Sequence, residues 1–275
     1  MAKVNEGNLL QHFVECEAAR QLIGPNSDKN LHVAFTHGMA PFEPAEDIAR
    51  SHGDVLGKIL ISLQAPNGPQ GGYPFAVLGA YQCVHASVAQ YPNSAVLLRD
   101  GLGLTLHGVL CESQDAIATM LRAWFPGIAI QAGSWRTAAR NGFLNPPPSL
   151  RVPWLFSMDP YTYHEVGAKD DGDLYKEDAG AIVTILEPYL KPTAAGMASI
   201  FCYSMDDCHS GLFEVFMRGI RDALNSRGNT VDAQFIRMPI SPTKQHVAGL
   251  IARDACLLRG ILKRWDEFWR GGEPS

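Results

Sequence analysis

The chain has 275 residues, a formal net charge of −5, 46% hydrophobic residues and 19% charged residues. This length suffices for one large α/β domain with a substantial core. The composition lacks the basic surplus of proteins that bind nucleic acid through its phosphates. The overall charge therefore gives no support to nucleic acid as a partner, although a local basic patch would be compatible with it.

The cysteines and the N-terminal segment predict a cytoplasmic protein. The sequence has six scattered cysteines and no CxxC pair, which is typical of reduced, mostly buried thiols. The first thirteen residues contain no long apolar region, and no run of eighteen apolar residues occurs anywhere. We therefore expect neither secretion nor a membrane partner.

The first forty residues predict a helix and then a strand. Residues 7–23 carry apolar side chains at helical spacing, with a polar opposite face. Residues 31–35 form a short β-rich run that leads into a loop of small residues at 36–41. A loop of small residues after the first strand is typical of a turn that contacts a ligand.

Residues 42–90 are expected to form a helical insertion within a single domain that spans 1–275. The region contains a helix candidate at 44–63 and a loop rich in glycine and proline. After it, Tyr91 and Pro92 open another short helix, for which Asn93 or Ser94 supplies the N-cap.

The segment 104–112 is a strand candidate that ends in an acid, Glu112, and a helix follows it up to Phe125. In doubly wound nucleotide-binding folds, an acid at the end of the second strand accepts hydrogen bonds from a ribose diol. A capping or solvent-facing role is the alternative for Glu112. A third strand candidate, 128–132, leads into Gly133, Ser134 and Trp135.

The segment 152–163 predicts a buried strand that ends in a polar group. Its apolar run stops at Asp159-Pro160, and aromatic and hydroxyl side chains follow. A buried parallel strand delivers such a group to the carboxyl edge of the sheet, where open α/β folds bind ligands. A carboxylate flanked by aromatic rings suits a flat ring that bears an amine, whereas an Asp-Pro turn is the simpler interpretation.

The remaining chain continues the alternation of helices and strands. Residues 164–178 are predicted to be a mobile, solvated loop beside the site. Helices are expected at 179–190, 213–226 and 257–269, and strands at 197–203, 231–238 and 248–252. This order predicts an α/β fold with a mostly parallel sheet and helices on both faces.

Tryptophans and cations lie together on the last predicted helix. Trp265 and Trp269 neighbour Lys263, Arg264 and Arg270. The cluster could contact nucleic acid by charge and stacking. Core tryptophans with solvated cations are favoured, because apolar residues recur at helical spacing.

In order and spacing, several of these motifs resemble the ribosomal-RNA large-subunit methyltransferase J family, from about Gly7 to Trp269. The matching segments are GNLLQH at 7–12 for the family's GNH…LKH, Thr36-His37 for the start of its DTHAGAG loop, YPNSA at 91–95 for YPGSP, LCES at 110–113 for an LCELHP-like segment, and Asp159-Pro160 for DPPY. The resemblance rests on the set of motifs, since each one alone is weak.

The resemblance implies a Rossmann-like class I methyltransferase fold and a methyl transfer from S-adenosylmethionine to the N6 amine of an adenine in ribosomal RNA. Asp159 would be the catalytic residue, which holds the acceptor amine by positioning rather than by strong base catalysis. The cofactor-binding residues that the resemblance implies are His12, His37, Ser94, Glu112, Gly133 and Ser134. The acceptor pocket that it implies consists of Pro160, Tyr161 and Tyr163.

The sequence departs from the family's motifs at several places. In the cofactor motifs, Gln11 replaces a lysine, Phe35 replaces the first-strand acid, and Met39 and Pro41 occupy the loop in which the family has glycines. The turn at 133–135 lacks its acid. In the catalytic motifs, the second proline of DPPY is replaced and its aromatic residue is shifted, and the NPPW segment is absent. A hydrogen bond missing from a ligand costs about 1–3 kcal/mol, so these changes predict weaker cofactor binding.

Three interpretations remain open. The first is a divergent methyltransferase that acts on an RNA adenine, another nucleic acid or a small amine. The second is a non-catalytic binding or interaction protein that kept the fold, and the third is a Rossmann-like enzyme that uses a different nucleotide. No GxSxG, HExxH or paired CxxC motif occurs, so hydrolytic chemistry and a metal are not expected.

Overall fold

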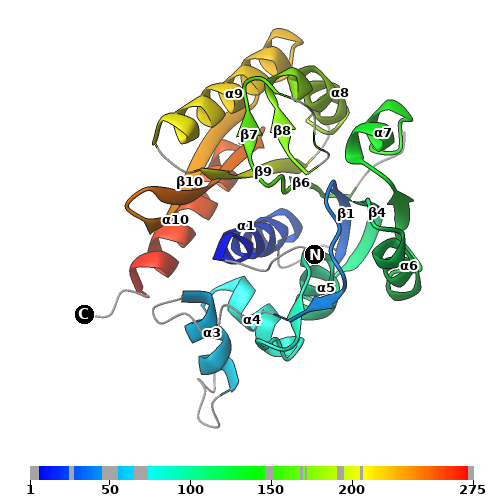
Figure 1. The fold of residues 1–275 in the computed structure, drawn as a ribbon, viewed down its shortest axis with the longest axis vertical. Coiled ribbons are helices and arrows are strands. Elements are labelled where there is room, and N and C mark those ends of the chain that lie inside the picture. The colour runs from blue at the N-terminus through cyan, green and yellow to red at the C-terminus, as the bar shows by residue number, and fades with distance from the viewer. Residues whose placement is uncertain are drawn as a thin grey trace.

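The computed structural model describes residues 6–24, 28–44, 55–64, 74–145, 152–167, 170, 172–190, 195–204 and 207–271. Seven strands form the central sheet of this part of the chain (Figure 1). They are β1 (Asn30–Phe35), β4 (Thr105–Glu112), β5 (Ala129–Ala132), β6 (Trp154–Met158), β9 (Gly196–Ser204), β10 (Asp232–Ser241) and β11 (Lys244–Ala252).

The strand order is β10-β11-β9-β6-β1-β4-β5. The pairs β5–β4, β4–β1, β1–β6 and β6–β9 are parallel, whereas β11 runs antiparallel to both β9 and β10. The chain leaves β1 toward β5 and then returns to build the other half from β6, so the strand order reverses beside β1. Ligands bind at such a switch point in open α/β sheets. The predicted α/β fold, with a mostly parallel sheet and helices on both of its faces, is confirmed.

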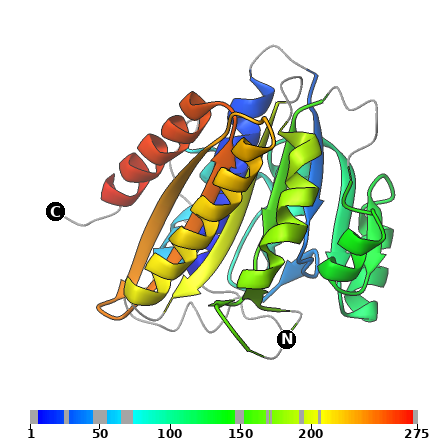
Figure 2. The same ribbon diagram turned by 90° about the horizontal axis from the view of Figure 1, so that it is seen from above.

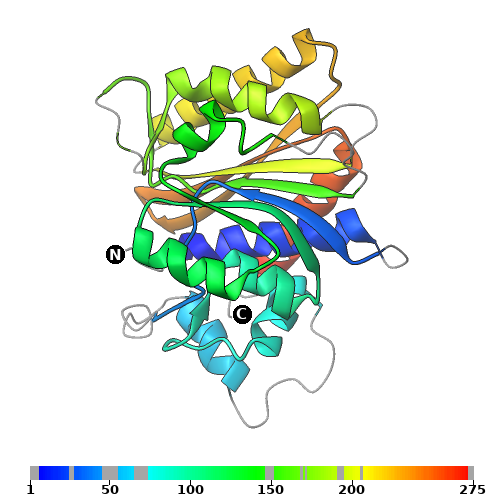
Figure 3. The ribbon, with the colours of Figure 1, turned by 90° about the vertical axis from the view of Figure 1, so that its right-hand side faces the viewer.

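Helices cover both faces of the sheet (Figure 3). One face carries α1 (Glu6–Ile23), α3 (Val55–Gln64), α4 (Ala76–Cys83), α5 (Ser94–Val96) with the π-helical turn Leu97–Gly101, α6 (Asp115–Trp124) and α10 (Ala255–Gly271). The other face carries α7 (Trp135–Arg140), α8 (Ala179–Tyr189) and α9 (Asp207–Ser226). Figure 2 shows α8 and α9 side by side in front of the sheet. Each face has its own apolar core.

The first helix is confirmed, but its predicted polar face is not exposed. Helix α1 packs against β6 and β9 on one side and contacts α3, α4 and α10 on others (Figure 1). Its buried polar side chains are Asn8, Gln11, His12, Glu15 and Glu17. Buried polar groups need hydrogen-bond partners, so this helix carries a polar network rather than a solvated face.

The region 42–90 contributes helices beside α1. Strand β2 (Phe42–Glu43) pairs with β3 (Tyr91–Pro92), and α3 and α4 both contact α1. Pro44, where the helix candidate was expected to start, is not helical. Residues 45–54 and 65–73, which include most of the loop rich in glycine and proline, lie outside the described residues. The assignment of this region as an insertion within a single domain stays a prediction.

The short helix after β3 begins as predicted. The Asn93 side chain caps α5 by accepting a hydrogen bond from the Val96 backbone N–H at 2.9 Å, and its amide nitrogen donates to the Met39 carbonyl at 2.9 Å. One side chain therefore fixes both the helix start and the loop after β1.

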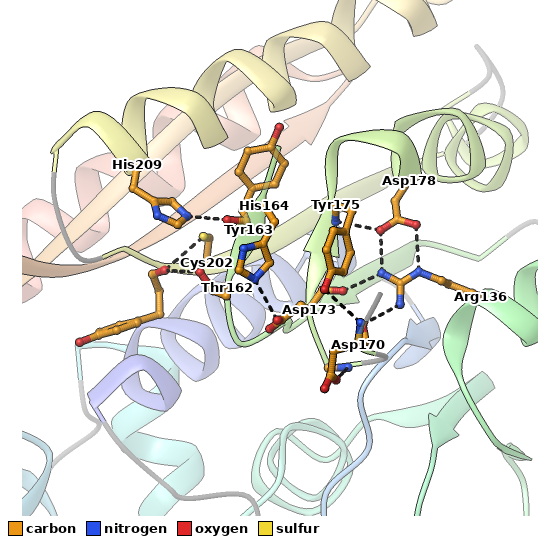
Figure 4. A network of polar contacts seen from close by, with 12 residues as sticks. Arg136, Thr162, Tyr163, His164, Asp170, Asp173, Tyr175, Asp178, Cys202 and His209 are labelled. Carbon is orange, nitrogen blue, oxygen red and sulfur yellow. Dashed lines mark hydrogen bonds and ion pairs between the residues drawn. The ribbon is translucent and has the colours of Figure 1, made fainter. Parts of the chain in front are cut away.

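The segment 164–178 is not the solvated loop that the composition predicts. Strand β7 (Tyr163–His164) pairs with β8 (Leu174–Tyr175), and a 3-10 turn (Lys176–Asp178) follows. Leu174, Tyr175 and Asp178 are buried. The Arg136 guanidinium donates to both oxygens of Asp178 at 2.9 and 2.7 Å (Figure 4), which anchors this segment to α7.

The last helix supports the core interpretation of its tryptophans. The Trp265 ring is buried, at 5.1 Å from the Phe13 ring and 5.8 Å from the Phe268 ring, measured between centroids. Among the described helices, none is long and apolar enough to cross a membrane. The described residues also contain no cluster of three or more acidic, histidine or cysteine side chains that could hold a metal ion.

Candidate functional site

The carboxyl ends of β1, β4 and β6 meet at one edge of the sheet. Three neighbouring cavities lie there in the described part of the chain, with volumes of about 120, 80 and 20 Å³. We call them the edge cavity, the aromatic cavity and the small cavity. Met39 and Asp159 line all three, so the cavities meet at these two side chains.

The edge cavity runs along the ends of β5, β4, β1 and β6. Gly133 and Ser134 line it after β5, Glu112 lines it at the end of β4, and His37 lines it after β1. The Gln114 backbone N–H donates to Glu112 Oε1 at 2.7 Å, and burial raises the pKa of Glu112. These neighbouring strand ends offer a carboxylate and two turns to a single elongated ligand.

Gly38 allows the loop after β1 to approach the end of β4. Its backbone N–H donates to the Cys111 carbonyl at 2.6 Å. A Cβ atom at this position would lie 3.0 Å from that carbonyl oxygen and 3.2 Å from the Cβ of Glu112. A larger residue would therefore displace the loop or Glu112.

Asp159 follows β6 directly and is held by the loop after β1. Its backbone N–H donates to Nδ1 of His37 at 3.3 Å, and the Thr36 hydroxyl lies 2.7 Å from the same nitrogen. The Thr-His pair thus links the ends of β1 and β6. Burial raises the pKa of Asp159 to about 7, which leaves this carboxyl able to hold or release a proton near neutral pH.

The aromatic cavity lies on the other side of Asp159. Pro160 and Tyr161 line it after β6, and Tyr203 and His246 line it from β9 and β11. The Tyr203 and His246 rings are 5.1 Å apart between centroids, and burial lowers the pKa of His246 to about 4. At neutral pH this wall is therefore uncharged and suited to an apolar, flat group.

Most of the predicted site residues are brought together. His37, Glu112, Gly133, Ser134, Asp159 and Tyr161 line the edge cavity, Ser94 lines the small cavity, and Pro160 lines the aromatic cavity. Tyr161 lies between the edge and aromatic cavities and is 65% exposed.

Two predicted residues lie away from these cavities. The His12 ring is buried, and its Nδ1 lies 3.0 Å from the hydroxyl oxygens of both Tyr81 and Tyr91. Burial lowers the pKa of His12 to about 3, so the ring is a neutral core group. The Tyr163 ring is 1% exposed and packs against Phe216 at 4.9 Å. Both side chains are therefore packed in the interior of the protein. Tyr163 lies there because β7 directs its ring toward α9.

Several lining residues were missed by sequence reasoning. Asn8, Met39, Glu43, Tyr203 and His246 come from five separate segments. Two of them carried a signal: Asn8 belongs to the GNLLQH motif, and Met39 occupies a loop position where the resembled family has a small residue. Tyr203 and His246 become neighbours through the antiparallel pairing of β9 and β11, which the local sequence does not encode.

The cavities share an acidic character. The described residues that line them include Glu43, Glu112 and Asp159 and no lysine or arginine. Burial raises the pKa of each of these three carboxyl groups. A site of this kind attracts a cationic ligand and repels phosphate groups.

Comparisons with known proteins agree with the fold. No protein-family model matches the chain, and no curated protein matches it. A solved structure, protein LPL1258 from Legionella pneumophila of family DUF519, is 14% identical, with a TM-score of 0.57 over 95% of this chain and 91% of that chain. Two other solved structures are more distant. A METTL16 methyltransferase domain is 9% identical, with a TM-score of 0.40 over 90% of this chain and 83% of that chain. A Bacillus cereus O-methyltransferase in complex with SAH is 12% identical, with a TM-score of 0.34 over 76% of this chain and 94% of that chain. The likeness to LPL1258 shows a shared fold over nearly the whole of both chains.

Proposed function

We propose that the protein binds S-adenosylmethionine in the edge cavity and methylates an amine that Asp159 holds. The observation that carries this proposal is the set of one buried and two half-buried carboxyl groups, Glu112, Glu43 and Asp159, around cavities whose described lining contains no lysine or arginine. S-adenosylmethionine carries a sulfonium group, an ammonium group and one carboxylate, so its net charge is positive. Dinucleotides and nucleoside triphosphates carry several negative charges, which these carboxyl groups would repel.

The residues of the edge cavity fit this ligand. Glu112 lies at the end of the second strand, where an acid binds a ribose diol in related folds. Gly38 permits the backbone to pass close to the end of β4, and Gly133 has a φ of 107°, which turns the chain after β5. Glu112, Gly133, Ser134 and His37 would therefore hold the cofactor.

When bound, the cofactor supplies an electrophilic methyl group. Asp159 would accept a hydrogen bond from the acceptor amine and so orient the nitrogen lone pair. With a pKa of about 7, its carboxyl group can also take up the proton that the amine releases. The uncharged walls of the aromatic cavity would exclude water and hold the ring that bears the amine.

We propose adenine N6 in RNA as the first acceptor to test. The resemblance in sequence motifs and the aromatic lining support a flat ring with an exocyclic amine. The acidic lining repels the phosphate groups of RNA and therefore favours a small aromatic amine as the second acceptor to test. A non-catalytic binding role is the second candidate, because Met39 lines all three cavities at a loop position where the family that the motifs resemble has a small residue.

The direct test is transfer of a labelled methyl group from S-adenosylmethionine to RNA, to adenosine or to small aromatic amines. We expect Asp159→Asn to lower the transfer rate about 100-fold or more, because an amide cannot take the proton. S-adenosylhomocysteine should still bind this variant measurably, because Glu112, Gly133 and Ser134 remain in the edge cavity. A wild-type chain that labels none of these acceptors, or a variant as fast as wild type, would contradict the proposal.

A further inference from the structure

Glu15 lies within α1 with its carboxyl group buried beneath the site. The Ser157 hydroxyl donates to Oε1 at 2.5 Å, the Gln11 amide donates to the same oxygen at 3.3 Å, and Ser94 also hydrogen-bonds this carboxyl. The second oxygen, Oε2, is buried and has no hydrogen-bond partner within the described residues. No described lysine or arginine forms an ion pair with Glu15, so its charge is left uncompensated inside the protein.

The groups that hold Glu15 also line the small cavity. Gln11, Ser94 and Ser157 surround this space together with Asp159. Its volume of about 20 Å³ has room for one water molecule or one ammonium group. Burial raises the pKa of Glu15 to about 7, and repulsion from Asp159 adds to this effect, so the two carboxyl groups act on the same region.

The small cavity is continuous in its lining with the edge cavity. His37, Gly38, Met39 and Asp159 belong to both. A single ligand with its ribose at Glu112 could therefore place an ammonium group beside Ser94 and Ser157. One oxygen of the buried Glu15 carboxyl group has no hydrogen-bond partner among the described residues, and the other accepts hydrogen bonds only from neutral donors. Such a group is suited to balance the charge of a primary ammonium group.

We propose that Glu15, with Asp159 beside it, balances the charge of one ammonium group in the small cavity, and that this is the amino group at the amino-acid end of S-adenosylmethionine. The inference rests on the proposed function. It assigns a binding role to a helix residue that does not itself line a cavity and that no motif indicated.

The first test compares two ligands on the wild-type chain by calorimetry. S-adenosylhomocysteine has the amino-acid end, and 5′-methylthioadenosine lacks it. We expect the first to bind at least tenfold more tightly. Equal affinities would overturn the role of Glu15 and leave the proposed function standing, whereas no binding of either ligand would overturn both.

The second test repeats this comparison with Glu15→Gln. We expect the affinity ratio of the two ligands to fall to within about threefold of one, with the 5′-methylthioadenosine affinity unchanged. A ratio that stays at its wild-type value, or an equal loss of affinity for both ligands, would show that Glu15 has only a structural role and overturn the proposal.

Glu17→Gln is the matched control. Glu17 is also buried in α1, but its carboxyl group accepts hydrogen bonds from Arg20 at 2.6 Å and from the Ala76 backbone at 2.9 Å, and it lines none of the three cavities. This variant should lose stability and keep the wild-type ligand ratio. Thermal unfolding checks that each variant folds. If Glu15→Gln does not fold, equal affinities of the wild-type chain for the two ligands still overturn the proposal.

Discussion

Asp159 and Glu15 are two carboxyl groups whose pKa values are both raised to about 7 by burial. A folded protein that raises the pKa of an acid binds its proton more tightly than the unfolded chain does. This tighter proton binding stabilises the folded protein fully at pH values below the pKa of the acid in the unfolded chain. The stabilisation is lost as the pH rises through the pKa of the acid in the folded protein. Both side chains therefore destabilise the empty protein at neutral pH, which is common for functional groups held ready for a ligand.

A pH prediction follows for Glu15. Its pKa rises from 4.5 to about 7, which corresponds to roughly 3 kcal/mol of unfolding free energy lost between those two pH values. Compared with wild type, Glu15→Gln should become progressively more stable from pH 4.5 to pH 7. Chemical unfolding at several pH values measures this difference.

The difference between variant and wild type is the quantity to compare. Burial lowers the pKa of three histidines, His12, His32 and His246, and their effect on stability has the opposite sign in this pH range. They contribute equally to both proteins and cancel in the comparison. A stability difference that stays constant from pH 4.5 to pH 7 would contradict the assignment of a raised pKa to Glu15.

Single residues at strand ends were the most predictable part of the site. Glu112 and Asp159 each follow an apolar run of strand length, so their position at the sheet edge could be read from the sequence. Glu15 could not, because it belongs to a helix whose polar residues look like an exposed face until α4 and α10 cover them. Likewise, the sequence around His12 does not show that two tyrosine hydroxyls enclose it.

At the scale of elements, the β7–β8 segment holds Tyr161 beside the site. The Tyr161 backbone N–H donates to the Gly172 carbonyl at 2.7 Å, and both residues line the edge cavity. Arg136 anchors the segment through Asp178 and also donates to the Asp173 carbonyl at 2.7 Å (Figure 4). The composition of 164–178 suggested a solvated loop because the segment is rich in charged residues. In the structure Asp178 pairs with Arg136 of α7, whereas His164 contacts Asp173 and Lys176 contacts Glu165 within the segment.

Arg136→Ala should destabilise the protein by about 3 kcal/mol. The Arg136 and Asp178 side chains are 13% and 4% exposed, and removing one partner leaves a buried charge. Chemical unfolding measures the loss, and hydrogen exchange should show faster exchange at Tyr161 and Leu174, whose amides bond within this segment.

Arg227→Ala is the control for this experiment. Arg227 pairs with Glu187 at 3.0 Å, but the two side chains are 46% and 32% exposed, so its removal should cost less than about 1 kcal/mol. If Arg136→Ala costs no more than Arg227→Ala, the ion pair does not anchor the segment.

At the scale of the whole molecule, the alternation of helices and strands was enough to predict the sheet and both helix layers. The sequence could not predict which cavities form, because the aromatic cavity needs β9, β11 and the start of α1 to converge. Nor did the mild net charge of −5 show that acids gather at one edge of the sheet. This concentration of acids distinguishes a site for a cationic methyl donor from one for a phosphorylated nucleotide.

The most direct test of this claim is calorimetric titration of the wild-type chain with S-adenosylmethionine and, separately, with NADP⁺. The acidic cavities predict saturable binding of S-adenosylmethionine at micromolar to submillimolar concentration and no measurable binding of NADP⁺. Glu112→Ala should weaken the first interaction about tenfold or more, since a hydrogen bond to a charged group is worth about 1.5–3 kcal/mol. Binding of NADP⁺ with no heat from S-adenosylmethionine at millimolar concentration would contradict the account.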